Sequence, residues 1–186
     1  MVKLQGEKVY LATLELEDCR NLCEETEFNF SNPTECFIVG FSSVKADDWF
    51  HEVQNKQGNT HIRLGIFLPN ADGSATVIGE IALQDINWQN RSCTLGYGLT
   101  KFEYRCKGYT TDAAKTILRY GLCHLGLERI SAATLENNIA SQRVLEKCGF
   151  TLEGRERKAV YIAGKRFDRL IYGLLSEEFI KVNGSS

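Results

Sequence analysis

The sequence lacks the features that would assign it to several specialised classes of protein. Its 22 basic and 24 acidic residues leave a net charge of only −2, so there is no general attraction to nucleic acid or to an anionic membrane. No apolar run is long enough to cross a bilayer, and the first residues, Met-Val-Lys-Leu-Gln-Gly-Glu, lack the apolar core of a signal peptide. We therefore expect a cytoplasmic protein with neither a nucleic-acid nor a membrane partner.

The sequence also lacks the cysteine and histidine spacings that are typical of metal sites and of activated nucleophiles. The seven cysteines include no Cys-x-x-Cys pair, and none of the three histidines stands at ligand spacing to a cysteine. We expect no metal site, and we expect cysteines that are reduced and half-buried. The histidines are isolated, so nothing in the sequence supports a Cys–His or Ser–His pair.

The length and composition suit one soluble domain. The chain has 186 residues, of which 43% are hydrophobic and 25% charged, and this permits a sizeable core. It contains no repeat, low-complexity tract or internal linker. We expect a single domain over residues 1–182 and a disordered tail at 183–186.

Hydrophobic periodicity predicts an α+β fold with a mostly antiparallel sheet and helices on both faces. The predicted strands are 9–14, 60–68, 75–86, 91–99, 129–135, 151–158 and 161–175. The predicted helices are 17–24, 43–56, a helix that follows Gly108 and ends at Leu125-Gly126, 138–148 and 176–182. The aromatic segment 27–39 is a predicted loop or broken helix, which either walls a pocket or adds to the core.

Segment 97–112 predicts a loop that binds an anion. An apolar strand runs up to Leu99, a polar loop with Arg105, Lys107 and Gly108 follows, and apolar residues at helical spacing come next. Gly108 lets the backbone approach a ligand closely, and the first amides of a helix have no partner within it. The pattern alone fits an ordinary loop equally well, and it is neither a Walker loop nor a Gly-x-Gly-x-x-Gly fingerprint.

A second informative segment, 136–150, places Asn138 and Ser141 three residues apart at a predicted helix start. In a purely structural interpretation, Asn138 is the N-cap, Ser141 lies in the first turn and Gly149 ends the helix. Residue types and spacing alone favour that interpretation over a functional one.

Together the two segments resemble the acetyl-CoA signature of the GNAT N-acetyltransferases. The resemblance is carried by Arg105-x-x-Gly108-x-Thr110, Asn138-x-x-Ser141, Glu146-Lys-Cys-Gly-Phe150, Glu153-Gly154 and Gly164-Lys-Arg-Phe-Asp168. These motifs are typical of the branch that contains the ribosomal-protein N-terminal acetyltransferases and their uncharacterised relatives. The similarity extends over roughly residues 11–179 and implies a GNAT-like sheet that splays at its middle strands.

The resemblance implies acetyl-CoA as a co-substrate. The family's loop falls on residues 105–110, whose backbone amides would bind the pyrophosphate, while Leu99 and Asn138 would flank the pantetheine arm. Thr110 stands where relatives have Gly or Ala, and Cys106 where they often have Gly, but both residues are compatible with binding through the backbone. The implied coenzyme-binding residues are Leu99, Arg105, Cys106, Lys107, Gly108, Tyr109, Thr110, Asn138 and Ser141.

Acetyl transfer needs a neutral amine, a hydrogen-bond donor for the oxyanion and a proton donor for the leaving thiolate. Many members of the family use a Tyr on the last of these helices as the proton donor, but Leu145 occupies that slot here. The branch offers Ser141 instead, and we expect Ser141 to be the catalytic acid. An acyl-enzyme on Cys106 or Cys148 is the less favoured alternative.

The general base is not identified by the sequence. The two positions at which related enzymes carry a Glu hold Ala133 and Val160 here. Glu80 and Glu103 are candidates near the predicted site, although each fits an ordinary solvated carboxylate better, and a water relay is the other alternative.

The branch makes a peptide or protein N-terminal amine the expected acceptor. A polyamine or aminoglycoside-like amine is the enzymatic alternative, and a catalytically silent acetyl-CoA-binding module is the alternative of another class. No clear acidic cluster favours a polycation, although Glu24-Glu25 and Asp47-Asp48 offer carboxylates. The sequence does not decide between a monomer and a homodimer.

Overall fold

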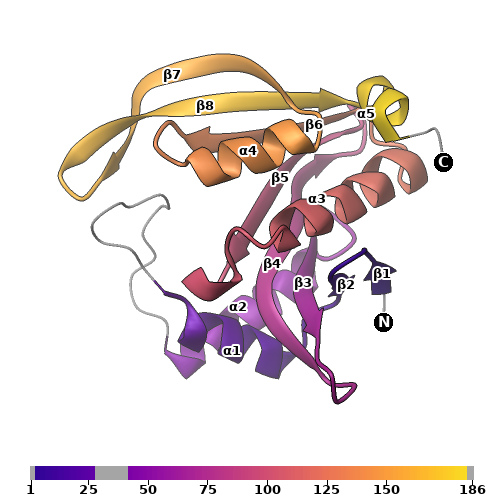
Figure 1. Cartoon of the computed structure of the whole chain (residues 1–186), viewed down its shortest axis with the longest axis vertical. Coiled ribbons are helices and arrows are strands. Elements are labelled where there is room, and N and C mark those ends of the chain that lie inside the picture. The colour runs from indigo at the N-terminus through magenta and orange to yellow at the C-terminus, as the bar shows by residue number, and fades with distance from the viewer. Residues whose placement is uncertain (1–2, 28–41, 184–186) are drawn as a thin grey trace.

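The computed structural model describes residues 3–27 and 42–183, and its centre is a mixed sheet (Figure 1). The strands are β1 (Lys3–Gln5), β2 (Tyr10–Ala12), β3 (Ile62–Pro69), β4 (Ala75–Asn87), β5 (Ser92–Leu99), β6 (Arg129–Leu135), β7 (Thr151–Ile162) and β8 (Lys165–Leu175). They lie in the order β1-β2-β3-β4-β5-β6-β8-β7. Every neighbouring pair is antiparallel except β5 and β6, which run parallel.

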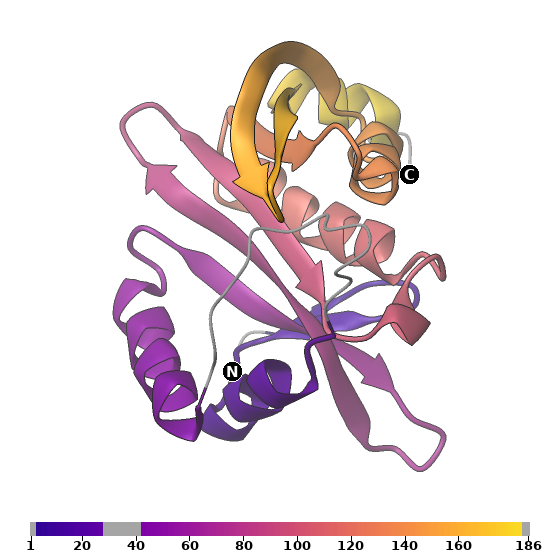
Figure 2. The ribbon, with the colours of Figure 1, turned by 90° about the vertical axis from the view of Figure 1, so that its left-hand side faces the viewer.

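Helices cover both faces of this sheet (Figures 1 and 2). They are α1 (Leu16–Glu25), α2 (Ser43–Lys56), α3 (Tyr109–Arg119), α4 (Ile139–Lys147) and α5 (Ser176–Asn183). One hydrophobic cluster joins α1 and α2 to β2, β3 and β4, and a larger cluster joins α3 and α4 to the opposite face. The predicted α+β class, with a mostly antiparallel sheet and helices on both faces, is confirmed.

Helix α3 packs tightly because its apolar residues form one stripe. Ala113, Ala114, Ile117 and Leu118 are all fully buried against the sheet, as the spacing i, i+1, i+4, i+5 requires for a single face. Burial of each of the two larger side chains contributes about 1.5–3 kcal/mol. The stripe therefore fixes the position of the α3 N-terminus relative to the strands.

Strands β5 and β6 separate soon after they begin. They pair only at Ser92–Arg129, Cys93–Ile130 and Thr94–Ser131. Beyond these pairs, β5 stays bonded to β4 and β6 stays bonded to β8. The splay at the middle strands is therefore present in the sheet.

One carboxylate attaches the N-terminal turn to the start of α3. Asp112 accepts hydrogen bonds from the backbone amides of residues 7–9, at 3.0, 2.8 and 3.0 Å. Beside it, Lys8 Nζ donates to the carbonyl oxygen of Lys107 at 2.9 Å. The turn between β1 and β2 is thus joined to the loop that leads into α3.

The predicted and observed elements differ mainly at their ends. Helix 43–56 and strand 129–135 are confirmed residue for residue. The first predicted strand, 9–14, is shorter than expected, and β1 was missed because three residues are too few to show a period. Residues 28–39 of the predicted aromatic loop and residues 184–186 of the predicted tail lie outside the described residues, whereas residue 183 belongs to α5.

Replacing Asp112 with Ala is expected to lower the free energy of unfolding by about 1–3 kcal/mol. The substitution removes the acceptor of three backbone amides and a carboxylate near a helix N-terminus. Urea unfolding followed by circular dichroism measures the change. The control Asp48→Ala removes an exposed carboxylate paired with Lys45 and should cost less than about 1 kcal/mol. Equal losses for the two variants would show that the hydrogen bonds of Asp112 to the N-terminal turn do not stabilise the fold.

Candidate active site

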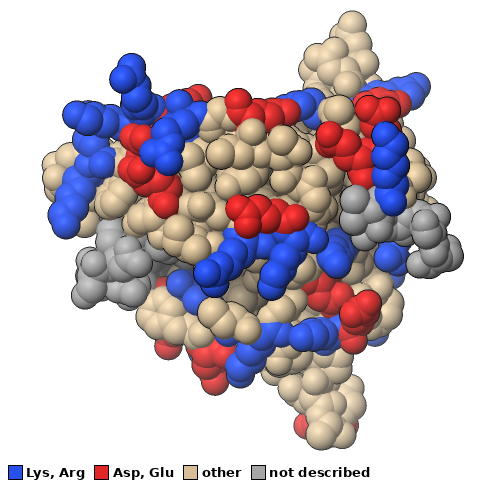
Figure 3. All heavy atoms as spheres, turned by 45° about the horizontal axis from the view of Figure 1, so that its top comes forward, with Lys and Arg blue, Asp and Glu red and all other residues tan. Residues whose placement is uncertain are grey.

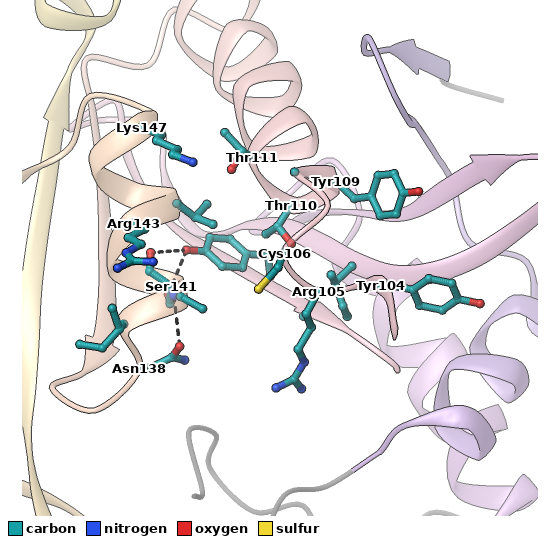
Figure 4. A pocket seen from close by; sticks show the side chains of 17 residues that line it. Tyr104, Arg105, Cys106, Tyr109, Thr110, Thr111, Asn138, Ser141, Arg143 and Lys147 are labelled. Carbon is teal, nitrogen blue, oxygen red and sulfur yellow. Dashed lines mark hydrogen bonds between the residues drawn. The ribbon is translucent and has the colours of Figure 1, made fainter. Parts of the chain in front are cut away.

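A cavity of about 410 Å³ opens between the end of β5, the start of α3 and one face of α4 (Figure 4). Strand β5 contributes Tyr97, Gly98 and Leu99. The loop and the start of α3 contribute Tyr104, Arg105, Cys106, Gly108, Tyr109, Thr110 and Thr111, and α4 with its cap contributes Asn138, Ile139, Ala140, Ser141, Arg143, Val144 and Lys147. The two segments singled out in the sequence therefore face each other across one space.

The loop between β5 and α3 carries a row of unpaired backbone amides. Gly108 (φ 85°) and Cys106 (φ 60°) both lie in the left-handed region, which Gly adopts without strain and Cys does not. Within residues 3–27 and 42–183, no acceptor is found for the backbone amides of residues 106–111. Successive amides at a helix N-terminus favour an anion.

The start of α4 is held by two amide side chains. Asn138 Oδ1 accepts a hydrogen bond from the backbone amide of Ser141 at 3.1 Å, so Asn138 is the N-cap. Gln142 Nε2 donates to the carbonyl oxygens of Leu135 and Glu136, at 3.2 and 3.0 Å. Because Asn138 also lines the cavity, the structural interpretation of this residue is confirmed without excluding a binding role.

Two hydroxyl groups meet inside the cavity. Tyr97 Oη lies 3.0 Å from Ser141 Oγ, and it also donates to the Ser141 carbonyl oxygen at 3.3 Å. Burial raises the pKa of Tyr97 to about 12, with the hydrogen bond to Ser141 opposing the shift. The phenol therefore keeps its proton at neutral pH. Leu145, which fills the family's Tyr slot, is only 1% exposed and belongs to the core.

The candidate carboxylates are not in the cavity. Glu80 forms a short ion pair with Arg63 between β4 and β3, and Glu103 lies on the short helical turn Phe102–Tyr104 outside the lining. Among the described residues, no Asp or Glu lines the cavity. A proton acceptor for the amine is thus not supplied by a described carboxylate.

The cysteines differ in exposure. Burial raises the pKa of Cys148 to about 11, so its thiol is poorly ionised, whereas Cys106 is exposed at the cavity.

In the part of the chain that the structure describes, no group of His, Cys, Asp or Glu could hold a metal ion. Over the same residues, no helix is long and apolar enough to span a membrane.

All the predicted coenzyme-binding residues except Lys107 line the cavity. The Lys107 carbonyl oxygen instead accepts the hydrogen bond from Lys8. The roles of Tyr97, Arg143 and Lys147 in the lining were not predicted. The sequence did carry signals for them, because Tyr97 lies two residues after buried Leu95 and so on the same face of β5, and the two cations are four residues apart on one helix.

Comparison with known proteins gives consistent matches. The family model described as the acetyltransferase (GNAT) domain matches residues 8–151. The chain is 31% identical over 186 residues to "Probable N-acetyltransferase YjcK" of Bacillus subtilis (strain 168), covering 94% of this chain and 98% of that protein. It is 31% identical over 132 residues to "Putative ribosomal N-acetyltransferase YdaF" of the same organism, covering 71% and 67%.

Solved structures share the fold. A crystal structure of a "Probable acetyltransferase" matches with a TM-score of 0.83 at 25% identity, covering 96% of this chain and 99% of the other. The spermidine N-acetyltransferase from Vibrio cholerae, in complex with CoA and spermine, matches with a TM-score of 0.79 at 20% identity, covering 94% and 99%. From the matched domain and these relatives, the chain belongs to the GNAT family of acetyltransferases.

Proposed function

We propose that the protein transfers an acetyl group from acetyl-CoA directly to a primary amine, and that this amine is the N-terminus of a peptide or protein. The observation that carries the proposal is a single cavity with an amide row at residues 106–111 and a hydroxyl pair, Tyr97 and Ser141. The relative named as a ribosomal N-acetyltransferase supports the choice of acceptor.

The lining residues fit the parts of coenzyme A. The pyrophosphate is suited to the amides of residues 106–110, because they have no acceptor among the described residues and stand at a helix N-terminus. Beyond Thr94, the edge of β5 that faces β6 has no partner strand among the described residues, so its backbone groups are available to an extended chain of amides. Leu99 on this edge and Asn138 on α4 would hold the pantetheine arm.

In the proposed chemistry, acetyl-CoA supplies a thioester whose carbon bonds to the amine nitrogen while its carbon–sulfur bond breaks. Ser141 Oγ–H donates the proton that the leaving thiolate needs, and a solvent proton passed through the Tyr97 hydroxyl, 3.0 Å from Ser141 Oγ, replaces it. With its pKa of about 12, Tyr97 holds a proton before and after this relay and does not end as a phenolate. A water molecule accepts the amine proton, since no described carboxylate lines the cavity.

The surroundings favour a peptide amine over a polyamine. Asp47 pairs with Arg20 at 2.8 Å, and Glu25 pairs with Lys101 at 2.6 Å. Two of the four carboxylates named in the sequence, Asp47 and Glu25, are therefore already paired with cations. The cavity lining itself contains Arg and Lys but, among the described residues, no Asp or Glu.

A panel of amines tests the proposed acceptor. Release of free thiol from acetyl-CoA should be fastest with a peptide that has a free N-terminus, and slower with spermidine or an aminoglycoside, because the cavity lacks anionic groups for a polycation. The same peptide with a blocked N-terminus is the control. Turnover on spermidine alone would replace the peptide with a polyamine, and tight coenzyme binding without turnover on any amine would identify a silent binding module.

Ser141→Ala should lower kcat by about 100-fold or more, since one positioned proton donor contributes roughly 10²–10⁴-fold. The dissociation constant for acetyl-CoA should change by less than about threefold, because the variant keeps the backbone amides that bind the phosphates. Steady-state kinetics and isothermal titration calorimetry separate the two effects. Ser92→Ala, at the other end of β5, is the matched control; unchanged turnover in Ser141→Ala would leave Ser141 as a helix-start residue only.

Gly108→Val should weaken coenzyme A binding by at least about tenfold. A side chain at φ 85° is strained by about 1–2 kcal/mol, and its Cβ would lie 3.1 Å from Lys8 Nζ, so it also presses on the side chain that bonds the loop. Gly73 also has φ 85°, in an exposed turn with open space around it. Gly73→Val therefore carries the same backbone strain and should bind normally. Equal affinities of the two variants for coenzyme A, measured by calorimetry, would refute phosphate binding by the backbone at Gly108.

A further inference from the structure

We propose that Arg143 and Lys147 form a second anion site in the cavity and that this site binds the 3′-phosphate of coenzyme A. The inference rests on the proposed function, because it takes coenzyme A as the ligand. It adds a specificity determinant that separates this coenzyme from its 3′-dephospho form.

The two cations share one wall of the cavity. Arg143 and Lys147 are four residues apart on α4 and both line the space, so they lie one above the other on the same helix face. Figure 4 shows Lys147 extending from α4 toward Thr111 and Arg143 on the same helix beside Ser141. They stand across the cavity from the amide row of residues 106–111.

Neither cation is neutralised within the described part of the chain, where no side-chain hydrogen bond or ion pair involves Arg143 or Lys147. By contrast, Arg129, Arg155 and Arg169 all form ion pairs with carboxylates. Like charges four residues apart destabilise a helix, so the pair is unfavourable for α4 until an anion lies between them.

The 3′-phosphate is the coenzyme group that this pair best fits. The pyrophosphate is matched by the amides of residues 106–110 on the opposite wall. Coenzyme A has one more phosphate, on its ribose, and this group is a dianion that suits one planar guanidinium and one ammonium. Figure 3 shows Lys and Arg side chains around a hollow in the middle of the face that it draws.

Calorimetry with coenzyme A and with 3′-dephospho-coenzyme A tests the assignment. The wild-type protein should bind coenzyme A at least about tenfold more tightly, since charge-assisted hydrogen bonds to the phosphate are lost with the dephospho ligand. The double variant Arg143→Gln/Lys147→Gln should lose that factor for coenzyme A only. It should bind the two ligands equally.

The control removes two positive charges elsewhere. Lys165→Gln/Arg166→Gln, at the start of β8 and outside the cavity lining, should keep the wild-type preference. Equal weakening of both ligands by the α4 double variant would assign the pair to the pyrophosphate and overturn the proposal, and an unchanged preference would overturn it too. If the wild-type protein binds neither ligand, the proposed function itself fails, and that outcome is distinct from a lost preference.

Discussion

The separation of β5 from β6 is the constraint on which the rest of the site depends. The two strands pair over only three positions, after which each keeps its other neighbour in the sheet. Because they are parallel, their C-terminal ends emerge at the same edge of the sheet. The connections to α3 and α4 begin there, so the two helices start on opposite sides of one space. The cavity follows from this divergence and from the packing of the α3 stripe.

The electrostatics of the cavity contrast with those of the whole chain. The protein has a net charge of −2, yet the described lining holds three cations and no carboxylate. Elsewhere, acidic groups are held by cations, as Glu80 is by Arg63 between β4 and β3. The cavity is lined by hydrogen-bond donors, which are backbone amides, a protonated phenol and a serine hydroxyl. Such a lining suits an anionic ligand and the protonation of a leaving group.

Local patterns were sufficient for much of the fold and for part of the site. Helix 43–56 and strand 129–135 were predicted residue for residue because their apolar spacing is complete within the segment. Strand β1 was not, since it is defined by its pairing with β2. Strand β7 extends to residue 162, beyond the predicted end, because its ladder with β8 continues past two register shifts.

By itself, the sequence determined that the two segments each begin a helix and that their motifs resemble an acetyl-CoA signature; the structure shows that both line one cavity. Only the tertiary structure decided that the hydroxyls of Tyr97 and Ser141, 44 residues apart, lie 3.0 Å from each other. It also decided that the Lys107 carbonyl bonds to the N-terminal turn, and that Arg143 and Lys147 face the loop. These relations depend on where two strands part and how two helices pack, and no local residue pattern encodes such long-range contacts.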